Sequence, residues 1–290
     1  MKIKELFNNK KTVISFEIFP PNSNYHIDSI YKTIDSLSNL NPDFISVTYG
    51  SGGSTRKRTV EIASIIKNNY NIEALAHLTC IGADKKEIDN ILRSLKQNNI
   101  ENILALRGDL PLEEKQLFKD FTHANELINY INKDNNFGIA SACYPEFHHE
   151  SNDILDLWNL KRKVDSGTDF LITQIFFDND ILYRFLDNAQ KININIPISA
   201  GIMPVLNKKQ ILRITKLCGS TLPKKFLRIL EKYEYNEKAL EQAGIAYALE
   251  QIVDLLSYGI DGIHFYTMNR IKSTEHIINS ISNIRSINNE

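Results

Sequence analysis

The chain contains few cysteines and almost no net charge, and both features argue against whole classes of function. Its three cysteines, Cys80, Cys143 and Cys218, lie far apart among 290 residues and form no C-x-x-C spacing. Neither a disulfide framework nor a structural zinc site is indicated, and a reducing compartment fits this cysteine usage best. The net charge of −1 gives no electrostatic reason to expect nucleic acid or a membrane surface as a partner.

Targeting signals and flexible linkers are also missing from the sequence. No N-terminal stretch shows the charged, apolar and small-residue order of a signal peptide, and the apolar run that ends at Phe19 is too short to span a bilayer. No segment rich in glycine, proline or serine divides the chain. We therefore expect a cytoplasmic protein in which residues 1–290 form one domain.

What the sequence does contain is a regular alternation of strand-like and helix-like segments. Amphipathic stretches, with apolar residues three and four positions apart, occupy residues 27–40, 59–69, 85–98 and 125–133. Eight apolar runs read as strands, at residues 12–19, 43–49, 73–80, 102–107, 138–143, 169–177, 196–202 and 262–267. Eight parallel strands with crossover helices predict a closed (β/α)8 barrel, which suits this length better than an open sheet or two small domains.

The interval between the last two runs, residues 207–258, is longer than one helix requires. We expect it to hold an extra helix beyond the regular one, with Pro223 near its start. Residues 247–256 then form the final helix before the last strand.

Glu17 is the most unusual residue of the first predicted strand. It lies within the apolar stretch 13–19, which Pro20 and Pro21 end. An unpaired buried carboxylate costs several kcal/mol, so such a group commonly keeps its proton. A carboxyl group that is protonated near neutral pH is what a general acid requires, which makes Glu17 the first candidate for chemistry. The alternative is a strand-end glutamate that reaches water or pairs with a basic residue.

Polar residues gather where the predicted strands end. In a parallel barrel these ends converge on one face, which is the face where barrel enzymes carry their active sites. Any one of these residues can simply bond to its own loop, but their coincidence across the strands favours an enzyme. They are Glu17, Thr48, Tyr49, His77, Thr79, Arg107, Asp109, Tyr144, His148, Gln174, Tyr266, Thr267 and Arg270.

The sharpest local pattern is Arg107-Gly108-Asp109, directly after an apolar run. Gly108 permits close approach of the backbone to a ligand, Arg107 can bind phosphate, and Asp109 can accept from a ring N–H group. The alternative is an ion pair between Arg107 and Asp109 that closes a turn. The glycines of segment 50–53 resemble a phosphate loop, but they lack the spacing of a dinucleotide fingerprint or a Walker loop.

Two further patterns have ordinary explanations. Residues 156–163 read as a helix that places four polar side chains at three and four spacing, as in a solvated helix face. His148 and His149, with His77 and Glu146 as companions, lack any recognised ligand spacing, so no metal site is expected.

Motifs at almost every strand end, in order from residue 12 to residue 275, together resemble the bacterial 5,10-methylenetetrahydrofolate reductases. They occupy segments 15–21, 46–50, 77–80, 106–111, 144–146, 160–165, 173–174 and 264–270. The resemblance implies a flavin-bearing (β/α)8 barrel in which NADH reduces FAD and then leaves. The reduced flavin passes hydride to methylenetetrahydrofolate, and the product, 5-methyltetrahydrofolate, supplies methyl groups for methionine synthesis.

The same resemblance implies a role for each matching residue. Glu17 corresponds to the general acid that protonates N10 of the folate, and Asp109 to the carboxylate that meets the pterin ring near the flavin. Gln174, Gln210 and Arg270 fall where the family contacts folate, and Thr48 and Gln174 where it contacts the nicotinamide nucleotide. The implied FAD contacts are Tyr49, Ser51, His77, Arg107, Gly108, Asp109, Ala124, Tyr144, His148, Asp156, Asn159, Arg162 and Lys163. The helix at 156–163 thus becomes a cofactor-binding helix, and relatives suggest a homotetramer.

The chain departs from the family pattern at a few positions. The loop after Pro111 is shorter than in relatives, His123 stands where a tyrosine is common beside the flavin, and Ile214 lies where an aromatic residue often stacks on the nicotinamide cofactor. The regulatory region by which eukaryotic members bind S-adenosylmethionine is not expected here. Two rivals stay open, namely another flavin barrel of the proline dehydrogenase type and a non-catalytic barrel that binds folate or flavin.

Overall fold

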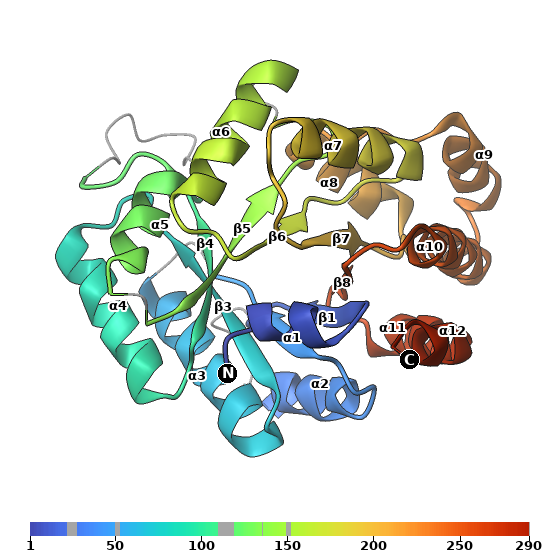
Figure 1. Cartoon of the computed structure of the whole chain (residues 1–290). Coiled ribbons are helices and arrows are strands. Elements are labelled where there is room, and N and C mark those ends of the chain that lie inside the picture. Colours follow the sequence, from blue (N-terminus) through green and yellow to red (C-terminus); the bar gives the residue numbers. More distant parts are fainter. Residues whose placement is uncertain (22–27, 50–52, 110–118, 135, 149–151, 290) are drawn as a thin grey trace.

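A closed barrel of eight parallel strands forms the centre of the molecule (Figure 1). The structure is a computed structural model that describes residues 1–21, 28–49, 53–109, 119–134, 136–148 and 152–289. The strands are β1 (Val13–Ile18), β2 (Phe44–Val47), β3 (Glu73–Thr79), β4 (Asn102–Leu106), β5 (Gly138–Cys143), β6 (Phe170–Thr173), β7 (Ile198–Ile202) and β8 (Gly262–Tyr266). Pairing of β1 with β8 closes the sheet. The predicted (β/α)8 barrel is confirmed, since each strand lies within one of the predicted runs.

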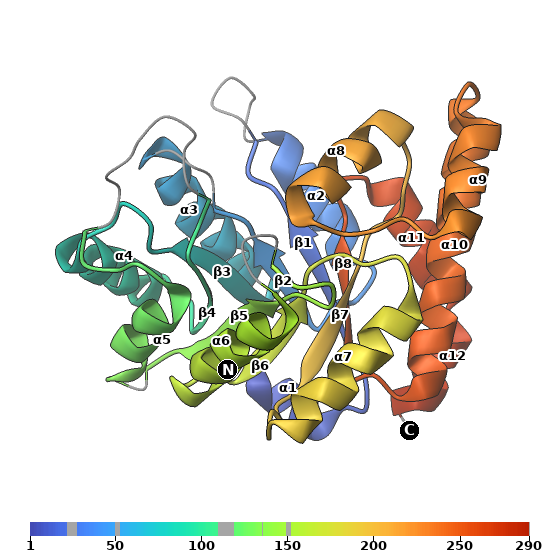
Figure 2. The same cartoon turned by 90° about the horizontal axis from the view of Figure 1, so that it is seen from above.

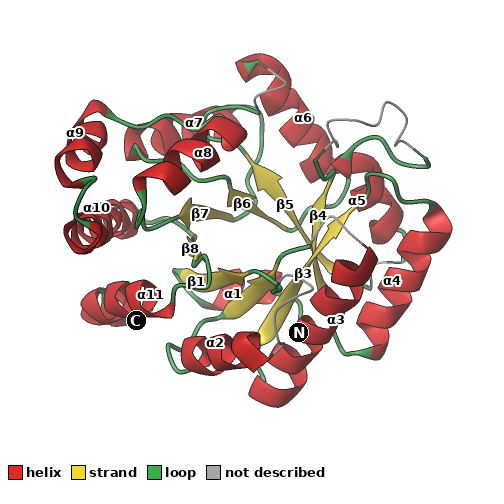
Figure 3. Cartoon of the chain, turned by 180° about the vertical axis from the view of Figure 1, so that it is seen from behind, coloured by secondary structure: helices red, strands yellow, loops and turns green. Residues whose placement is uncertain are grey.

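Helices surround the barrel (Figure 3). They are α1 (Lys4–Asn9), α2 (Asp28–Ser38), α3 (Gly53–Tyr70), α4 (Lys85–Gln97), α5 (Ala124–Asn132), α6 (Asp153–Asp165), α7 (Asn179–Lys191), α8 (Lys208–Cys218), α9 (Lys224–Tyr233), α10 (Glu237–Tyr258), α11 (Ile271–Ser280) and α12 (Ser282–Asn289). The four amphipathic stretches predicted from the sequence correspond to α2 to α5, although α3 begins earlier than expected, at Gly53. Within the described residues, none of these helices combines the length and the apolar character that a membrane span requires.

The interval between β7 and β8 holds α8, α9 and α10, so two helices rather than one extend the regular pattern. Gly219 ends α8 with a positive φ of 77°, and Pro223 stands at the start of α9 as predicted. The final helix begins at Glu237, well before residue 247, because the side chain of Asn236 accepts a hydrogen bond from the N–H of Ala239 and caps it. The break before Asn236 carries neither glycine nor proline, so the sequence contained no strong signal for it.

Apolar side chains fill the end of the barrel where the strands begin. Val13, Phe44 and Phe170 belong to an inward-facing cluster that Ile3 and Phe7, on or beside α1, cover from outside. Figure 2 shows α1 at one end of the barrel and the loops that follow the strands at the other. Packing therefore closes this end, and the polar positions lie toward the opposite end.

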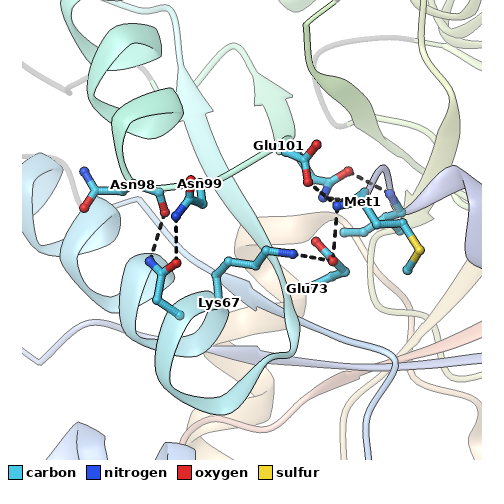
Figure 4. Close-up of polar contacts among 9 residues, drawn as sticks. Met1, Lys67, Glu73, Asn98, Asn99 and Glu101 are labelled. Carbon is cyan, nitrogen blue, oxygen red and sulfur yellow. Dashed lines mark hydrogen bonds and ion pairs between the residues drawn. The ribbon is translucent and has the colours of Figure 1, made fainter.

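Polar contacts around Met1 complete the closed end of the barrel (Figure 4). The amine of Met1 pairs with Glu101, and it lies 3.3 Å from Glu73 Oε1. Lys67 Nζ contacts the same Glu73 oxygen at 2.5 Å. These contacts connect the start of the described chain to β3 and to the residue that precedes β4, and they are structural.

Candidate functional site

A cavity of about 520 Å³ lies at the carboxyl ends of the strands, and we call it the strand-end cavity. It has the size of a small-molecule site and the position of a barrel active site. The structure brings to it most of the site residues predicted from the sequence, namely Glu17, Thr48, Tyr49, His77, Arg107, Gly108, Asp109, Tyr144, His148 and Gln174. Residues that the sequence did not single out as ligand contacts complete the lining, among them Ile81, Leu106, Ala142, Ile172 and Tyr266.

A second cavity, of about 570 Å³, adjoins the first beside α6 and α5, and we call it the α6 cavity. Arg107, Tyr144 and His148 line both cavities, so the two lie next to each other. Five further predicted cofactor contacts line this one, namely Ala124, Asp156, Asn159, Arg162 and Lys163. The polar side chains of α6 therefore line a cavity.

Glu17 is nearly buried, with 5% of its surface exposed, at the inner edge of the strand-end cavity. Its Oε2 atom lies 3.4 Å from Nε2 of His77 and 3.5 Å from Nε2 of His264. No other ion pair or hydrogen bond of this carboxyl group to the described residues exists, so Oε1 has no protein partner among them. Within the described part of the chain, this carboxyl group therefore pairs with two imidazoles and with no lysine or arginine.

The loop after β8 holds the end of β1 and with it Glu17. The hydroxyl of Thr267 donates to the backbone carbonyl of Glu17 at 2.6 Å. The side chain of Asn269 accepts from the N–H of Phe19 and donates to its carbonyl, both at 3.0 Å. Asn269 thus continues the pairing of β1 and β8 past the last strand residue, and its positive φ of 55° is one that asparagine tolerates. Hydrogen bonds from the loop after β8 therefore hold the backbone at Glu17 and at Phe19.

Burial determines the protonation of the groups around Glu17. It lowers the pKa of His77 to about 4, while the carboxylate of Glu17 opposes this shift, so the His77 ring is neutral near pH 7. Ser46 Oγ lies 2.6 Å from Nε2 of the same ring. Burial also raises the pKa of Tyr266 well above its usual range, and its hydroxyl donates to the carbonyl of Thr173 at 2.8 Å. Near pH 7, His77 and Tyr266 therefore make the inner wall of the cavity polar without adding a positive charge to it.

Three cationic side chains line the α6 cavity. Lys163 Nζ donates to the carbonyl of Ala142 at 2.6 Å. Desolvation lowers its pKa and raises that of Asp156, and the attraction between the two charges opposes both shifts. Arg107 and Arg162 line the same cavity. Guanidinium and ammonium groups in such a cavity are suited to bind phosphate oxygens.

Gly108 occupies a position that other residues cannot adopt without strain. Its φ is +89°, and a Cβ atom here would lie 2.6 Å from Cγ2 of Ile81. Arg107 Nε donates to the carbonyl of Gly108 at 3.2 Å. A backbone without a side chain therefore lines the strand-end cavity at this point, as expected for a surface that a flat ligand approaches closely.

Two predicted folate contacts lie apart from both cavities. Gln210 and Arg270 line a small hollow between the start of α8 and the start of α11.

Ser51 and His149 lie outside the described residues. Glu146 accepts from the N–H of Thr221 at 3.0 Å, and no group of three or more His, Cys, Asp or Glu side chains within the described ranges is arranged to hold a metal ion.

Three buried residues behind Glu17, namely Ser15, Ser46 and His264, begin motifs noted in the sequence, but no role was predicted for them. Each is 0% exposed. Inward-facing positions of such barrels are usually filled by branched apolar side chains, so polar residues there are unusual. The spacing of residues along the strands could have indicated them. Ser15 and Glu17 are two positions apart on β1, and His264 and Tyr266 are two positions apart on β8. Residues two apart on a strand point to the same side.

Comparison with known protein families agrees with the motifs at the strand ends. The sequence model described as methylenetetrahydrofolate reductase matches residues 2–282. The chain belongs to the methylenetetrahydrofolate reductase family. It is 36% identical over 269 residues to the 5,10-methylenetetrahydrofolate reductase of Escherichia coli, covering 92% of this chain and 90% of that protein. The resemblance drawn from the sequence is confirmed.

Longer plant members of the family match over about half of their length. The methylenetetrahydrofolate reductase (NADH) 1 of Arabidopsis thaliana is 37% identical over 292 residues, which cover 96% of this chain and 49% of that protein. This chain therefore spans about half the length of the plant relatives that it matches.

Two solved structures share the barrel fold at low sequence identity. A protein from Clostridium thermocellum, described as binding two copies of 5-methyl-5,6,7,8-tetrahydrofolic acid, aligns with a TM-score of 0.67 at 16% identity over 98% of both chains. A dihydropteroate synthase from Coxiella burnetii, in complex with pteroic acid, aligns with a TM-score of 0.52 at 12% identity, over 95% of this chain and 93% of that one. These likenesses concern the fold alone.

Proposed function

We propose that this protein reduces 5,10-methylenetetrahydrofolate to 5-methyltetrahydrofolate, with NADH as reductant and FAD as bound cofactor. The observation that carries the proposal is the nearly buried carboxyl group of Glu17 at the edge of a cavity on the strand-end face. A protein that only binds a ligand has no need of such a group. Membership in a family whose members are named for this reaction supports the proposal, and the NADH-dependent plant relatives support the choice of reductant.

The two adjoining cavities suit an extended dinucleotide such as FAD. Arg107, Arg162 and Lys163 can hold its phosphates, and the bare backbone at Gly108 can approach its flat ring. When bound there, FAD supplies a hydride acceptor and donor, which no side chain can provide. The residues that would hold it are those implied by the family, Tyr49, Ser51, His77, Arg107, Gly108, Asp109, Ala124, Tyr144, His148, Asp156, Asn159, Arg162 and Lys163.

In this proposal Glu17 is the general acid. Its Oε1 atom has no protein partner in the described part of the chain, so that oxygen is the one available to protonate N10 of the folate. Asp109 meets the pterin ring, and Gln174 contacts the folate and, with Thr48, the nicotinamide nucleotide. All of these line the strand-end cavity, which fits two substrates that use one site in turn.

Gln210 and Arg270 are proposed as further folate contacts. Because they line a separate hollow between α8 and α11, the folate must extend from the strand-end cavity toward that hollow to reach them. We further propose that the product supplies methyl groups for methionine synthesis and that the protein is a homotetramer, which light scattering of the purified protein would test.

The test is the colour of the purified protein and its response to the two substrates. Protein supplied with FAD should be yellow, NADH should bleach it without oxygen, and methylenetetrahydrofolate should then restore the colour. A colourless protein that takes up no FAD would refute the proposal. Bleaching by proline instead would indicate a proline dehydrogenase type, and a flavin that neither NADH nor proline bleaches would indicate a binding protein.

A further inference from the structure

A chain of buried polar groups lies behind Glu17, away from the strand-end cavity. Ser15 Oγ lies 2.7 Å from Nδ1 of His264, and Nε2 of the same ring lies 3.5 Å from Oε2 of Glu17. Ser15 and His264 are both 0% exposed, and neither lines the cavity, whereas Glu17 does. Ser15 and His264 therefore do not line the ligand cavity themselves, and Glu17 is the cavity residue to which His264 is hydrogen-bonded.

The sheet holds the three groups in register. Ser15 of β1 stands opposite His264 of β8, and Glu17 stands opposite Tyr266. The His264 ring stacks on Phe44 with ring centroids 6.2 Å apart, and it meets the edge of Tyr266 at 5.2 Å. Because close packing on two sides restricts rotation of the ring, its two nitrogens stay directed at Ser15 and Glu17.

Among the described residues, Ser15 is the hydrogen-bond partner of Nδ1 of His264 and Glu17 is that of Nε2. When Nε2 carries the proton, it donates to Oε2 of Glu17, and Nδ1 accepts from the hydroxyl of Ser15. An oxygen that already accepts a hydrogen bond is a poor place for the carboxyl proton. The proton then resides on Oε1, the oxygen that has no partner among the described residues.

We propose that His264, oriented by Ser15, is a positioning residue that holds Oε2 of Glu17 and so presents a protonated Oε1 to the substrate. The inference rests on the proposed folate reduction and names two residues that assist it. His77 contacts Oε2 from another side at 3.4 Å, but it also lines the cavity. Because substituting His77 would also alter ligand contacts, Ser15 and His264 provide the cleaner test.

Two variants test the Ser15 hydroxyl and the His264 ring one at a time, and a third serves as a control. Ser15→Ala removes the hydroxyl and keeps the imidazole, whereas His264→Phe keeps a ring against Phe44 and removes both nitrogens. Ser199→Ala is the matched control, since Ser199 is also 0% exposed within the barrel and its hydroxyl has no hydrogen-bond partner in the residues described. If His264→Phe does not fold, the smaller change Ser15→Ala still tests the proposal.

Anaerobic stopped-flow absorbance provides the first readout. We expect bleaching by NADH to stay within about twofold of wild type in all three variants, because that step needs no carboxyl proton. Recovery of the colour with methylenetetrahydrofolate should slow by about tenfold in Ser15→Ala and by more in His264→Phe, because His264 donates to a carboxyl group that becomes charged as it gives up its proton. The pH profile of this recovery should shift in both variants and not in Ser199→Ala.

A second readout needs neither cofactor nor activity. Nitrogen-15 NMR of protein labelled at histidine should show the His264 proton on Nε2 in wild type and a mixture of tautomers in Ser15→Ala. A proton on Nδ1 in wild type, equal slowing of both steps, or unchanged recovery in both variants would overturn the inference. A wild type that NADH bleaches and methylenetetrahydrofolate does not restore overturns the proposed function instead, and the tautomer then still shows whether His264 holds Oε2.

Discussion

Replacement of Glu17 by glutamine removes a proton donor with almost no change in shape. The amide can occupy the same space beside His77 and His264, whose nitrogens lie 3.4 and 3.5 Å from Oε2. A positioned general acid contributes about 10²- to 10⁴-fold to its step, or roughly 3–5 kcal/mol of the barrier. The folate step of Glu17→Gln should therefore slow by that factor. Reduction by NADH needs no such proton and should stay within about twofold of wild type.

Anaerobic stopped-flow absorbance measures the two steps of Glu17→Gln separately. The variant should bleach with NADH at a normal rate and then stay bleached in methylenetetrahydrofolate. Glu146→Gln is the matched control, because this carboxyl group also follows a barrel strand but accepts from Thr221 and lines neither cavity. Equal loss of both steps in Glu17→Gln would show that Glu17 is structural, and normal recovery with folate would refute its role as the acid.

Three further predictions follow from burial and close contacts. Because His77 is neutral in the fold with a pKa of about 4, stability is retained above pH 6.5 and falls as the pH decreases toward 4. Between pH 7 and pH 5 the free energy of unfolding, measured in urea, should fall in wild type by about 2 kcal/mol more than it falls in His77→Gln. Lys163→Met should weaken FAD binding by about tenfold or more, measured by flavin fluorescence, since it removes a cation from the α6 cavity. Gly244→Ala should destabilise the fold by about 3 kcal/mol or more, since its Cβ would meet the carbonyl of Val205.

Matched variants control two of these predictions. Lys161→Met removes an ammonium from the same helix that pairs with Asp165 and lines neither cavity, so FAD affinity should not change. In Gly259→Ala no described atom lies within 4 Å of the added Cβ, and only the strain of a φ of +89° remains, so the change should cost about 1–2 kcal/mol. If Lys161→Met weakened FAD as much as Lys163→Met, or if both glycine variants lost equal stability, the local contacts would not be the cause. For His77, an equal pH dependence in variant and wild type would show that another group titrates.

The barrel and most of the cavity lining were predictable because parallel strands carry two signals at once. Strands that are buried on both faces read as continuous apolar runs, so β1 to β8 each stood out. The residues that follow such runs must meet on one face, and Arg107, Tyr144 and Gln174 do so. The break between α9 and α10 was not predictable, because an asparagine cap is a weaker signal than glycine or proline.

The sequence by itself determined that a carboxyl group lies buried in the first strand and that polar residues share its end of the barrel. Only the tertiary structure decided which groups surround that carboxyl. His264 is 247 positions from Glu17, and barrel closure brings the two side chains within 3.5 Å. It also decided that Oε2 is held while Oε1 has no partner among the described residues, and that Gln210 and Arg270 lie in a separate hollow. Distances between residues remote in the chain depend on strand register and barrel closure, and the local pattern of residues does not specify either of these.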